Sequence, residues 1–325
     1  MSYRNRIVII FLSLAAILFQ SAFSGERPGK PVPVRIGVVS RSTLDMPYYV
    51  ARDRGFFREE GLAPEIIFIR SSLAVQALLA GSLDFGTAMG TAISAIVNGA
   101  DLRVVLAMTD KPAFDLIAHP SITKIAELRG KRIGFGGVGG LSELIIRQIL
   151  AAHQIPPDQV KFLPMGQNSL TYASLKAGMI DATMLQIPQN FLAEDDGFRK
   201  LAAGADYYRV VQGGLATTKA TTTERSELVA KVIRATLRAV GWIRSEKKQA
   251  IEFMRGPYLD LGGERERFTE RIYEAAVQGY LLSGIVDEKL QREMIASAAQ
   301  RIKSAQPLAP ERVFDFSFAR AAGER

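Results

Sequence analysis

The chain contains no cysteine among its 325 residues, and this excludes disulfides, thiolate metal ligands and cysteine nucleophiles. A chain without thiols also suits export into an oxidising compartment, where nothing can mispair. Only two histidines are present, His119 and His153, and neither belongs to a catalytic or metal-binding pattern such as HExxH, H-x-E or GxSxG. General acid–base and metal chemistry therefore lack obvious groups. We expect no enzymatic activity, no metal and no cofactor.

The charge is basic but not concentrated. Lysine and arginine number 41 against 33 acidic residues, for a formal net charge of +8. The basic residues are interspersed with acids, as in REEG (58–61), RSEKK (244–248) and GERERFTER (263–271). Nucleic-acid binding typically needs a dense basic patch, often with interleaved aromatic residues. We therefore expect a mildly basic, solvated surface and no nucleic-acid partner.

The N-terminal residues resemble a secretory signal. Arg4 and Arg6 precede an apolar run, Ile7–Phe19, of about 13 residues, and Ala22 and Ser24 occupy the −3 and −1 positions of a cut before Gly25. The run is shorter than the roughly 20 residues that span a bilayer. This pattern predicts a cleaved signal peptide over residues 1–24 and a periplasmic location, with an uncleaved membrane anchor as the alternative. A lipid anchor is not predicted, because no cysteine lies at the cut.

Short apolar runs alternate with amphipathic stretches from Val34 onward. Val34–Val39, Pro64–Ile69, Arg103–Met108 and Ala113–Ala118 have the composition of strands, and helical patterns lie between the first three. The same alternation restarts at Lys131–Phe135. Strands that alternate with helices predict an α/β fold, with mainly parallel sheets covered on both faces.

The two halves of this pattern repeat each other. Residues 80–86 (AGSLDFG) and 177–182 (AGMIDA) each predict a helix end, a glycine stop, a turn with Asp, and a buried strand. Two similar α/β units indicate two lobes with a cleft between them. We expect lobe one over residues 31–117 and lobe two over 118–211. Residues 212–325 are expected to return to lobe one, with C-terminal helices packed on its outside and bracing both lobes.

One segment resembles a known family. Met46–Leu62 (MPYYVARDRGFFREEGL) is similar to the opening of the nitrate/sulfonate/taurine-type periplasmic binding proteins, whose pattern is a Pro-aromatic turn followed by A-x-x-x-G-F-F-x-x-x-G-L. The match continues through residues 81–86, 128–134 and 178–182. Each motif occurs widely, but the ordered set is specific. The resemblance implies a type II-like periplasmic-binding-protein fold and a monomeric solute-binding component of an ABC importer, with the permease subunits as partners.

Ligands of two-lobed α/β proteins bind between the lobes, outside the carboxyl ends of the strands. The loops that follow the strands of lobe one therefore supply candidate ligand-binding residues: Arg41, Ser42, Tyr48, Ser71, Ser72, Met89, Gly90 and Thr91. Each has a structural alternative. Arg41 could pair with Asp45, Tyr48 could belong to the core, Ser71 or Ser72 could cap a helix, and Gly90 could serve packing.

The candidates in lobe two begin with a glycine-rich turn, residues 136–143. Its members Gly137, Gly139, Gly140 and Ser142 would present backbone amides suited to an oxyanion, and the resemblance implies that this turn lines the cleft. The turn lacks the Lys-Ser/Thr ending of a P-loop and the spacing of GxGxxG. Two glutamines and a proline follow the next two strands, with ordinary turns as the alternative: Gln167, Gln186 and Pro188.

These observations predict solute capture by hinge closure about crossovers near Ala118 and Val211. Helix starts together with Arg41 or Arg70 favour a small organic anion of the sulfonate or carboxylate type. A pyrimidine or aromatic compound remains an alternative solute, since Tyr48, Tyr172 and Met89 leave room for a ring. A sensory role in place of transport is a second alternative. An exported enzyme is least expected. The resemblance extends to pyrimidine-synthesising proteins, which use a cysteine-rich stretch and an active-site histidine, but this chain has no cysteine and so cannot share that site.

Overall fold

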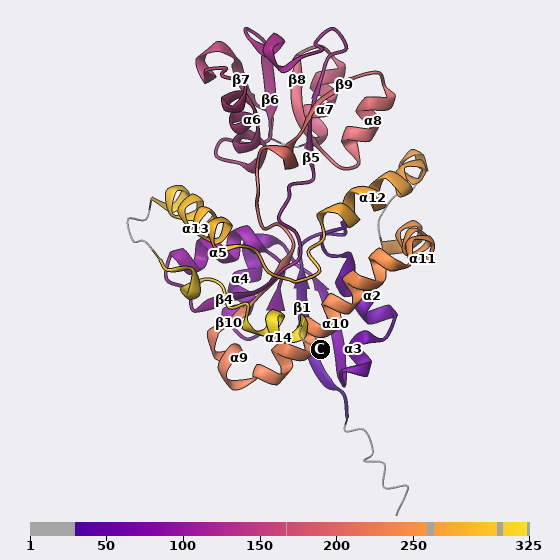
Figure 1. Cartoon of the computed structure of the whole chain (residues 1–325), viewed down its shortest axis with the longest axis vertical. Helices are drawn as coiled ribbons and strands as arrows, with labels where there is room; N and C mark the ends of the chain where they lie inside the picture. The colour runs from indigo at the N-terminus through magenta and orange to yellow at the C-terminus, as the bar shows by residue number, and fades with distance from the viewer. Residues whose placement is uncertain (1–29, 167, 259–262, 304–307, 324–325) are drawn as a thin grey trace, which may run out of the picture.

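The computed structural model describes residues 30–166, 168–258, 263–303 and 308–323. The chain forms two lobes, each built on a five-stranded sheet (Figure 1). The first sheet has the order β2-β1-β3-β10-β4 and consists of β1 (Val32–Val38), β2 (Leu62–Phe68), β3 (Phe85–Gly86), β4 (Leu102–Ala107) and β10 (Gly214–Thr218). The second has the order β7-β6-β8-β5-β9 and consists of β5 (Phe114–Ala118), β6 (Arg132–Phe135), β7 (Lys161–Pro164), β8 (Ala182–Gln186) and β9 (Arg199–Ala203).

Both sheets are mixed. β1 pairs in parallel with β2 and β3, and β6 pairs in parallel with β7 and β8. The antiparallel pairs involve β10 in the first sheet and β5 in the second, the strands that enter each sheet directly after a crossing between lobes. β5 already belongs to the second sheet. The first crossing therefore lies at residues 108–113 and not near Ala118, which is the last residue of β5.

Helices cover both sheets. Those of the first lobe are α2 (Met46–Asp53), α3 (Phe56–Glu59), α4 (Ser71–Leu79), α5 (Met89–Val97), α9 (Lys219–Glu224) and α10 (Ser226–Ser245), and those of the second are α6 (Leu141–Ala152), α7 (Asn168–Lys176) and α8 (Gln189–Asp195). The chain continues with α11 (Lys247–Phe253), α12 (Thr269–Gly279), α13 (Glu288–Ile302) and α14 (Ser317–Gly323). α2 and α3 do not form one helix, because Gly55 between them has a left-handed φ of 81°.

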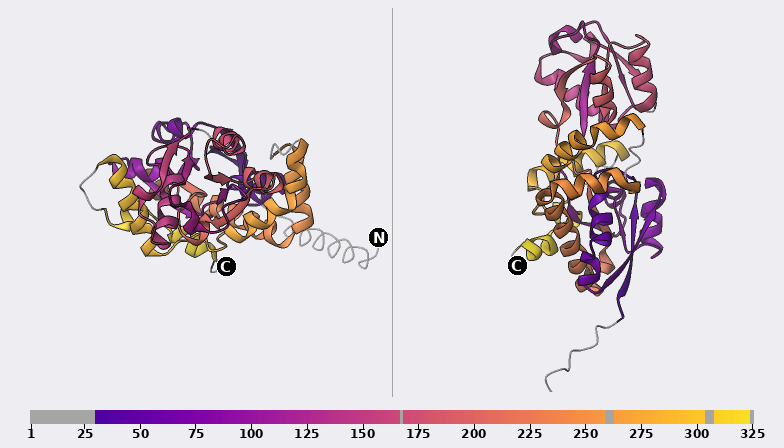
Figure 2. Two further views of the ribbon diagram at one scale, coloured as in Figure 1. Left: turned by 90° about the horizontal axis from the view of Figure 1, so that it is seen from above. Right: turned by 90° about the vertical axis from the view of Figure 1, so that its right-hand side faces the viewer.

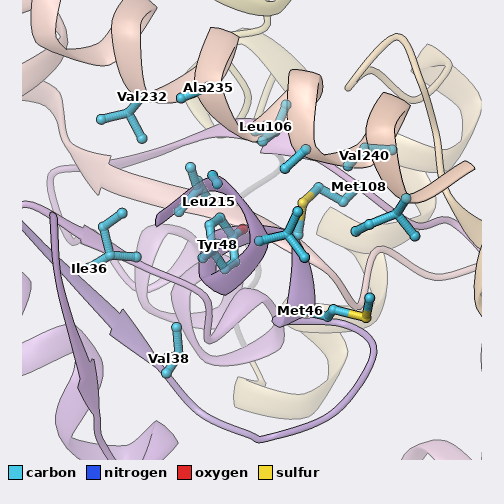
Figure 3. Packing of buried hydrophobic residues seen from close by; sticks show 14 of the residues in the cluster. Ile36, Val38, Met46, Tyr48, Leu106, Met108, Leu215, Val232, Ala235 and Val240 are labelled. Atoms are coloured by element: carbon cyan, nitrogen blue, oxygen red, sulfur yellow. The ribbon is translucent and has the colours of Figure 1, made fainter. Parts of the chain in front are cut away.

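The largest buried cluster lies between the first sheet and α10 (Figure 3). Val232, Ala235 and Val240 of α10 face Ile36 of β1 and the side chain of Tyr48 from α2. α10 has its apolar residues on one face, which is how a 20-residue helix covers a sheet. This packing confirms the α/β fold class expected from the sequence.

The two lobes repeat one ion-pair arrangement. In the first lobe, the backbone N–H and the guanidinium of Arg35 donate to Asp84, and in the second lobe those of Arg132 donate to Asp181. Burial alone would raise the pKa of Asp84, but hydrogen bonds from Arg35 and Arg225 hold it below its ordinary value. The side chain of Arg132 likewise lowers the pKa of Asp181. Each aspartate thus ties a strand to the turn that precedes a parallel neighbour in the same sheet, β3 beside β1 and β8 beside β6.

Gly214 is the position where the fold tolerates a side chain least. A Cβ atom added there would lie 2.2 Å from the carbonyl oxygen of Leu106, which belongs to the paired strand and cannot move aside. We expect Gly214→Ala to lower the free energy of unfolding by about 1–3 kcal/mol or more, as overpacking does. Urea unfolding measures this. Gly137→Ala is the control, because no atom lies within 4 Å of its added Cβ. Equal midpoints for the two variants would contradict the packing described.

Candidate functional site

The two segments that cross between the lobes are hydrogen-bonded to each other. Met108 N–H donates to the carbonyl oxygen of Gly213 at 2.7 Å, and Gly213 N–H donates to Thr109 Oγ1 at 2.9 Å. Further along, Val210 N–H donates to the carbonyl oxygen of Asp110 at 2.9 Å. The connection between the lobes is therefore a paired ribbon and not two independent linkers. We call this ribbon, residues 108–113 and 209–213, the hinge.

The segment after α12 joins the hinge. Leu281 N–H donates to the carbonyl oxygen of Met108 at 2.7 Å, and the buried hydroxyl of Tyr280 donates to the carbonyl oxygen of Thr43. Burial raises the pKa of Tyr280 above its ordinary value, so its hydroxyl stays protonated and able to donate. The end of α12 is thus fixed to the hinge and to the loop that follows β1.

A cavity of about 240 Å³ lies at this junction. Segments of both lobes and α12 line it: Thr43, Leu44, Thr109, Lys111, Pro112, Ala113, Phe114, Asp115, Ile187, Phe191, Lys200, Ala203, Ala205, Asp206, Ala275, Ala276, Gln278, Gly279 and Tyr280. It lies beyond the carboxyl ends of β1, β4, β8 and β9, where α/β proteins bind ligands. We call it the hinge cavity.

The charged groups of the hinge cavity are of two kinds. Lys200 and Asp115 form an ion pair at 2.9 Å, and the buried amide of Asn190 donates to the same carboxylate at 2.6 Å. Lys111 and Asp206, by contrast, form no ion pair among the described residues. The described lining therefore leaves one lysine and one aspartate side chain without an ion-pair partner. Its remaining lining is largely apolar.

The predicted residues after β1 lie in different places. Ser42 precedes Thr43 and Leu44 of the cavity lining, and its Oγ is 2.8 Å from Ser40 Oγ. Arg41 is exposed and lines a separate hollow of about 610 Å³ beside Arg52 and Arg54. The alternative pairing of Arg41 with Asp45 is not formed.

Two predicted ligand contacts of lobe one belong to the core. Tyr48 is fully buried, and its hydroxyl donates to the carbonyl oxygen of Gly214 at 2.9 Å (Figure 3). Met89 is 2% exposed and packs beneath the same strand. Their sequence position next to a strand end is compatible with either role. Tyr48 lies on the buried side of α2 and Met89 on the buried side of α5, so we assign both side chains to packing.

The helix starts of lobe one remain accessible. Ser71 and Ser72 are exposed at the first turn of α4, where Arg70 holds the N-cap position and neither hydroxyl caps the helix. The capping alternative is therefore wrong. Gly90 and Thr91 occupy the first turn of α5, exposed and half-buried respectively. None of these four residues lines the hinge cavity.

The glycine-rich turn satisfies much of its own hydrogen bonding. Gly136 N–H donates to Ser142 Oγ at 3.1 Å, Gly140 N–H to the carbonyl oxygen of Gly137 at 2.9 Å, and Gly139 N–H to Glu143 Oε2 at 2.7 Å. Glu143, only 6% exposed, thus takes the position that the sequence suggested for an anionic ligand. Ser142 supports the turn, and the turn does not line the hinge cavity.

Gln186 and Pro188 flank Ile187, which lines the hinge cavity. Gln167 lies outside the described residues. The structure therefore gathers the neighbourhoods of Ser42, Gln186 and Pro188 around one cavity. It leaves the helix starts and the glycine-rich turn apart from it.

Sequence reasoning missed the hinge and α12 as sources of cavity residues. Lys111-Pro112 lies between two predicted strands, and an exposed lysine between buried strands was the available signal. The last turn of α12 gave no signal, because its small residues are ordinary for a helix. Asn190 and Asp115 are far apart in sequence, and only the fold brings them together.

The buried side chain of Asp45 holds the loop after β1 in place through hydrogen bonds. Its carboxylate, 2% exposed, accepts hydrogen bonds from the backbone N–H and the hydroxyl of Ser40 at 2.9 and 2.8 Å. Burial raises the pKa of Asp45 from 3.8 to about 6, although hydrogen bonds from Ser40 and Thr87 act in the opposite direction. The loop that carries Thr43 and Leu44 thus rests on a carboxyl group that titrates near neutral pH.

This raised pKa gives a testable pH dependence. A carboxyl whose pKa is higher in the folded state favours folding at low pH, and this contribution is lost as the pH rises from 3.8 through about 6. Relative to Asp45→Asn, the wild type is expected to lose on the order of 3 kcal/mol of unfolding free energy between pH 4 and pH 7. Urea unfolding at several pH values measures the difference.

Exposed Asp158→Asn is the matched control and is expected to show no such trend. A difference between wild type and Asp45→Asn that stays constant, or that grows in favour of the wild type with pH, would contradict the buried titration.

Residues 30–166, 168–258, 263–303 and 308–323 contain neither a cluster of metal-ligating side chains nor a membrane-spanning helix. Within these ranges, no three histidine, aspartate or glutamate side chains are grouped closely enough to hold a metal ion. No helix there combines the length and the apolar character needed to cross a membrane.

Comparisons with known proteins agree with this geometry. The chain matches the sequence profile described as NMT1/THI5 like over residues 43–250. A protein of Brucella abortus, provisionally named a binding protein, is 26% identical over 207 residues, which cover 63% of each chain. The match thus spans less than two thirds of that relative.

Two solved structures show the same fold. The periplasmic aliphatic sulphonate binding protein SsuA of Escherichia coli superposes with a TM-score of 0.70 at 17% identity, over 87% of this chain and 97% of its own. DszB, solved as a mutant with biphenyl-2-sulfinic acid, superposes with a TM-score of 0.63 at 14% identity, over 91% and 99%.

Two mixed sheets, a paired crossover and a cavity between the lobes define the class of two-lobed proteins with the periplasmic-binding-protein fold. The profile match covers more than half of the chain. The chain belongs to the NMT1/THI5-like family.

Proposed function

We propose that this protein captures a small organic anion of the sulfonate or carboxylate type in the hinge cavity and delivers it to an ABC importer. The carrying observation is Lys111, an exposed cation without an ion pair among the described residues, on the wall of a cavity between two lobes. An acidic group at Lys111 would supply the missing partner, and charge-assisted hydrogen bonds are the strong ones.

The size and lining of the cavity narrow the solute class. Its 240 Å³ lies below the roughly 300–1,000 Å³ of pockets for drug-sized ligands, so a small solute fits. Phe114, Ile187 and Leu44 would bury an apolar body. Asp206 on the same wall favours a solute that also carries an amine or another hydrogen-bond donor. The proposed solute is therefore a compact acid with a short apolar body.

The neighbours support an anion without deciding which one. SsuA is named for aliphatic sulphonates, and DszB was solved with a sulfinic acid. A pyrimidine or aromatic compound is the second candidate, because Phe114 and Phe191 both line the cavity. An exported enzyme on the same fold is the least favoured alternative. The described lining of the hinge cavity contains no histidine, and we propose binding and not catalysis.

The cellular role follows from the same proposal. Residues 1–24 would direct the chain through the inner membrane as a signal peptide, and the mature protein would act in the periplasm as a monomer. Rotation about the hinge would close the lobes over the solute, and the closed form would dock on the permease subunits. A sensory partner instead of a permease would require the same closure.

A thermal-shift screen of the purified protein tests the proposed class. The panel comprises alkanesulfonates, aminosulfonates, short carboxylates, aromatic acids and pyrimidines. A solute present at 100 times its Kd adds about 2.7 kcal/mol to the unfolding free energy and raises Tm by a few degrees. We expect shifts with the first two groups. A folded protein that responds only to uncharged pyrimidines would contradict the anion.

Lys111→Gln tests the proposed anchor. Loss of one charge-assisted contact costs about 1.5–3 kcal/mol, so we expect Kd for a sulfonate to rise at least tenfold in titration calorimetry. Lys248→Gln, at an exposed position of α11 outside the hinge cavity, is the matched control and should bind as the wild type does. Equal affinities for all three proteins would exclude Lys111 as the anchor.

A further inference from the structure

α12 lies between the lobes, directly beneath α8 (Figure 1). Figure 2 (right) shows the second lobe stacked above the C-terminal helices. On the side of lobe two, Arg271 of α12 donates to Glu194 of α8, and Arg267 pairs with Asp195 at 2.9 Å. Single exposed pairs of this kind are weak. Here two lie close together, so lobe two is tied both to the first turn of α12, at Arg271, and to Arg267, two residues before the helix begins.

An apolar contact reinforces these pairs. Phe191 of α8 is 7% exposed, and its ring centroid lies 5.9 Å from that of Phe268, just before α12. The guanidinium of Arg271 stacks over the Phe191 ring at 4.1 Å. Although Phe191 belongs to a helix of lobe two, it is buried in the same cluster as the core of lobe one.

The opposite side of α12 is tied to lobe one. Lys247 of α11 pairs with Glu270 at 2.7 Å and with Glu274 at 3.1 Å. The hydroxyl of Tyr273 donates to the carbonyl oxygen of Ile243 in α10 at 2.9 Å. One helix thus holds partners in both lobes, independently of the hinge.

The last turn of α12 forms part of the hinge cavity. Ala275, Ala276, Gln278 and Gly279 line it before Tyr280 joins the hinge. These residues lie beyond residue 250, where the family match ends. Three of them are small and leave space, and the fourth presents an exposed amide.

We propose that α12 is a third wall of the solute site, held in register by its ties to both lobes, and that Gln278 on this wall selects solutes by size. The position of the wall rests on the structure alone, and the selection by Gln278 rests on the proposed function. Closure must then carry α12 with lobe two or break the pairs at Arg271. In either case the Arg271–Glu194 pair restricts how far the lobes separate.

The absence of cysteine permits a direct test in the full protein. Cysteines introduced at exposed Ser72 and Val138, one in each lobe, carry spin labels, and pulsed EPR measures the distance between them. Arg271→Glu breaks the pair, Glu194→Arg breaks it from the other side, and the double variant restores it with the charges exchanged. Arg292→Glu, which disrupts a pair within α13, is the matched control.

We expect either single reversal to broaden the distance distribution and shift it to longer values. The double variant should recover at least half of the shift, and the control should match the wild type. Distributions that are the same for Arg271→Glu and the wild type would overturn the third wall. If Arg271→Glu does not fold by circular dichroism, Arg267→Glu against Asp195 is measured in its place, with the same expected shift.

Gln278→Trp tests the selection, with exposed Gln300→Trp on α13 as its control. Calorimetry with methanesulfonate and with the largest sulfonate that the wild type binds gives the readout. We expect Gln278→Trp to weaken the larger solute at least tenfold and methanesulfonate by less than threefold. Equal effects on both would overturn selection by Gln278. A wild type that binds no sulfonate would refute the proposed function and this selection with it, while the EPR result would still decide whether α12 ties the lobes together.

Discussion

The hydrogen-bonded hinge is the constraint on which the rest of this structure depends. Each crossing segment satisfies backbone groups of the other, and Leu281 adds a third segment through Met108. Backbone groups buried without partners are costly, so the ribbon resists local separation. It places the carboxyl ends of β4 and β8 on opposite sides of one cavity. The position of the proposed solute site is therefore a consequence of how the lobes are joined.

Buried polar groups near the site serve mainly to fix loops. Asp45 supports the loop after β1, Tyr48 links α2 to Gly214, and Glu143 closes the glycine-rich turn. All three are satisfied within the protein and so leave little for a ligand. The polar groups proposed for a solute are Lys111 of the hinge, with Asp206 and Gln278 elsewhere on the wall of the hinge cavity. A site whose loops are held by internal hydrogen bonds, and which has few unpaired charged groups, is suited to binding a solute and not to catalysing a reaction.

Much of the fold was predictable from local patterns. The repeated glycine-turn-aspartate segments predicted two similar units. The structure explains the repeat, because Asp84 and Asp181 accept equivalent hydrogen bonds from Arg35 and Arg132. The sequence could not show to which lobe the strand of residues 114–118 belongs. A short, fully buried apolar strand has the same composition in either sheet, and only its partners β8 and β9 decide its place.

The candidate site was predictable in kind but not in residues. The rule of strand ends pointed to the edge of each sheet where the hinge cavity lies, and Ser42, Gln186 and Pro188 adjoin this cavity. The same rule could not reveal that the N–H of Gly139 already donates to the carboxylate of Glu143. Nor could it reveal that α12, more than 150 residues after Lys111 in the chain, packs against the hinge. Both depend on tertiary contacts that no local pattern carries.

The most direct test of solute binding at the hinge is a crystal structure of the protein with a bound sulfonate from the screen. We expect the acidic group within hydrogen-bonding distance of Lys111 and the apolar body between Phe114 and the last turn of α12. A solute bound at the helix starts of one lobe, or in the hollow beside Arg41, with the hinge cavity empty, would contradict the proposed site.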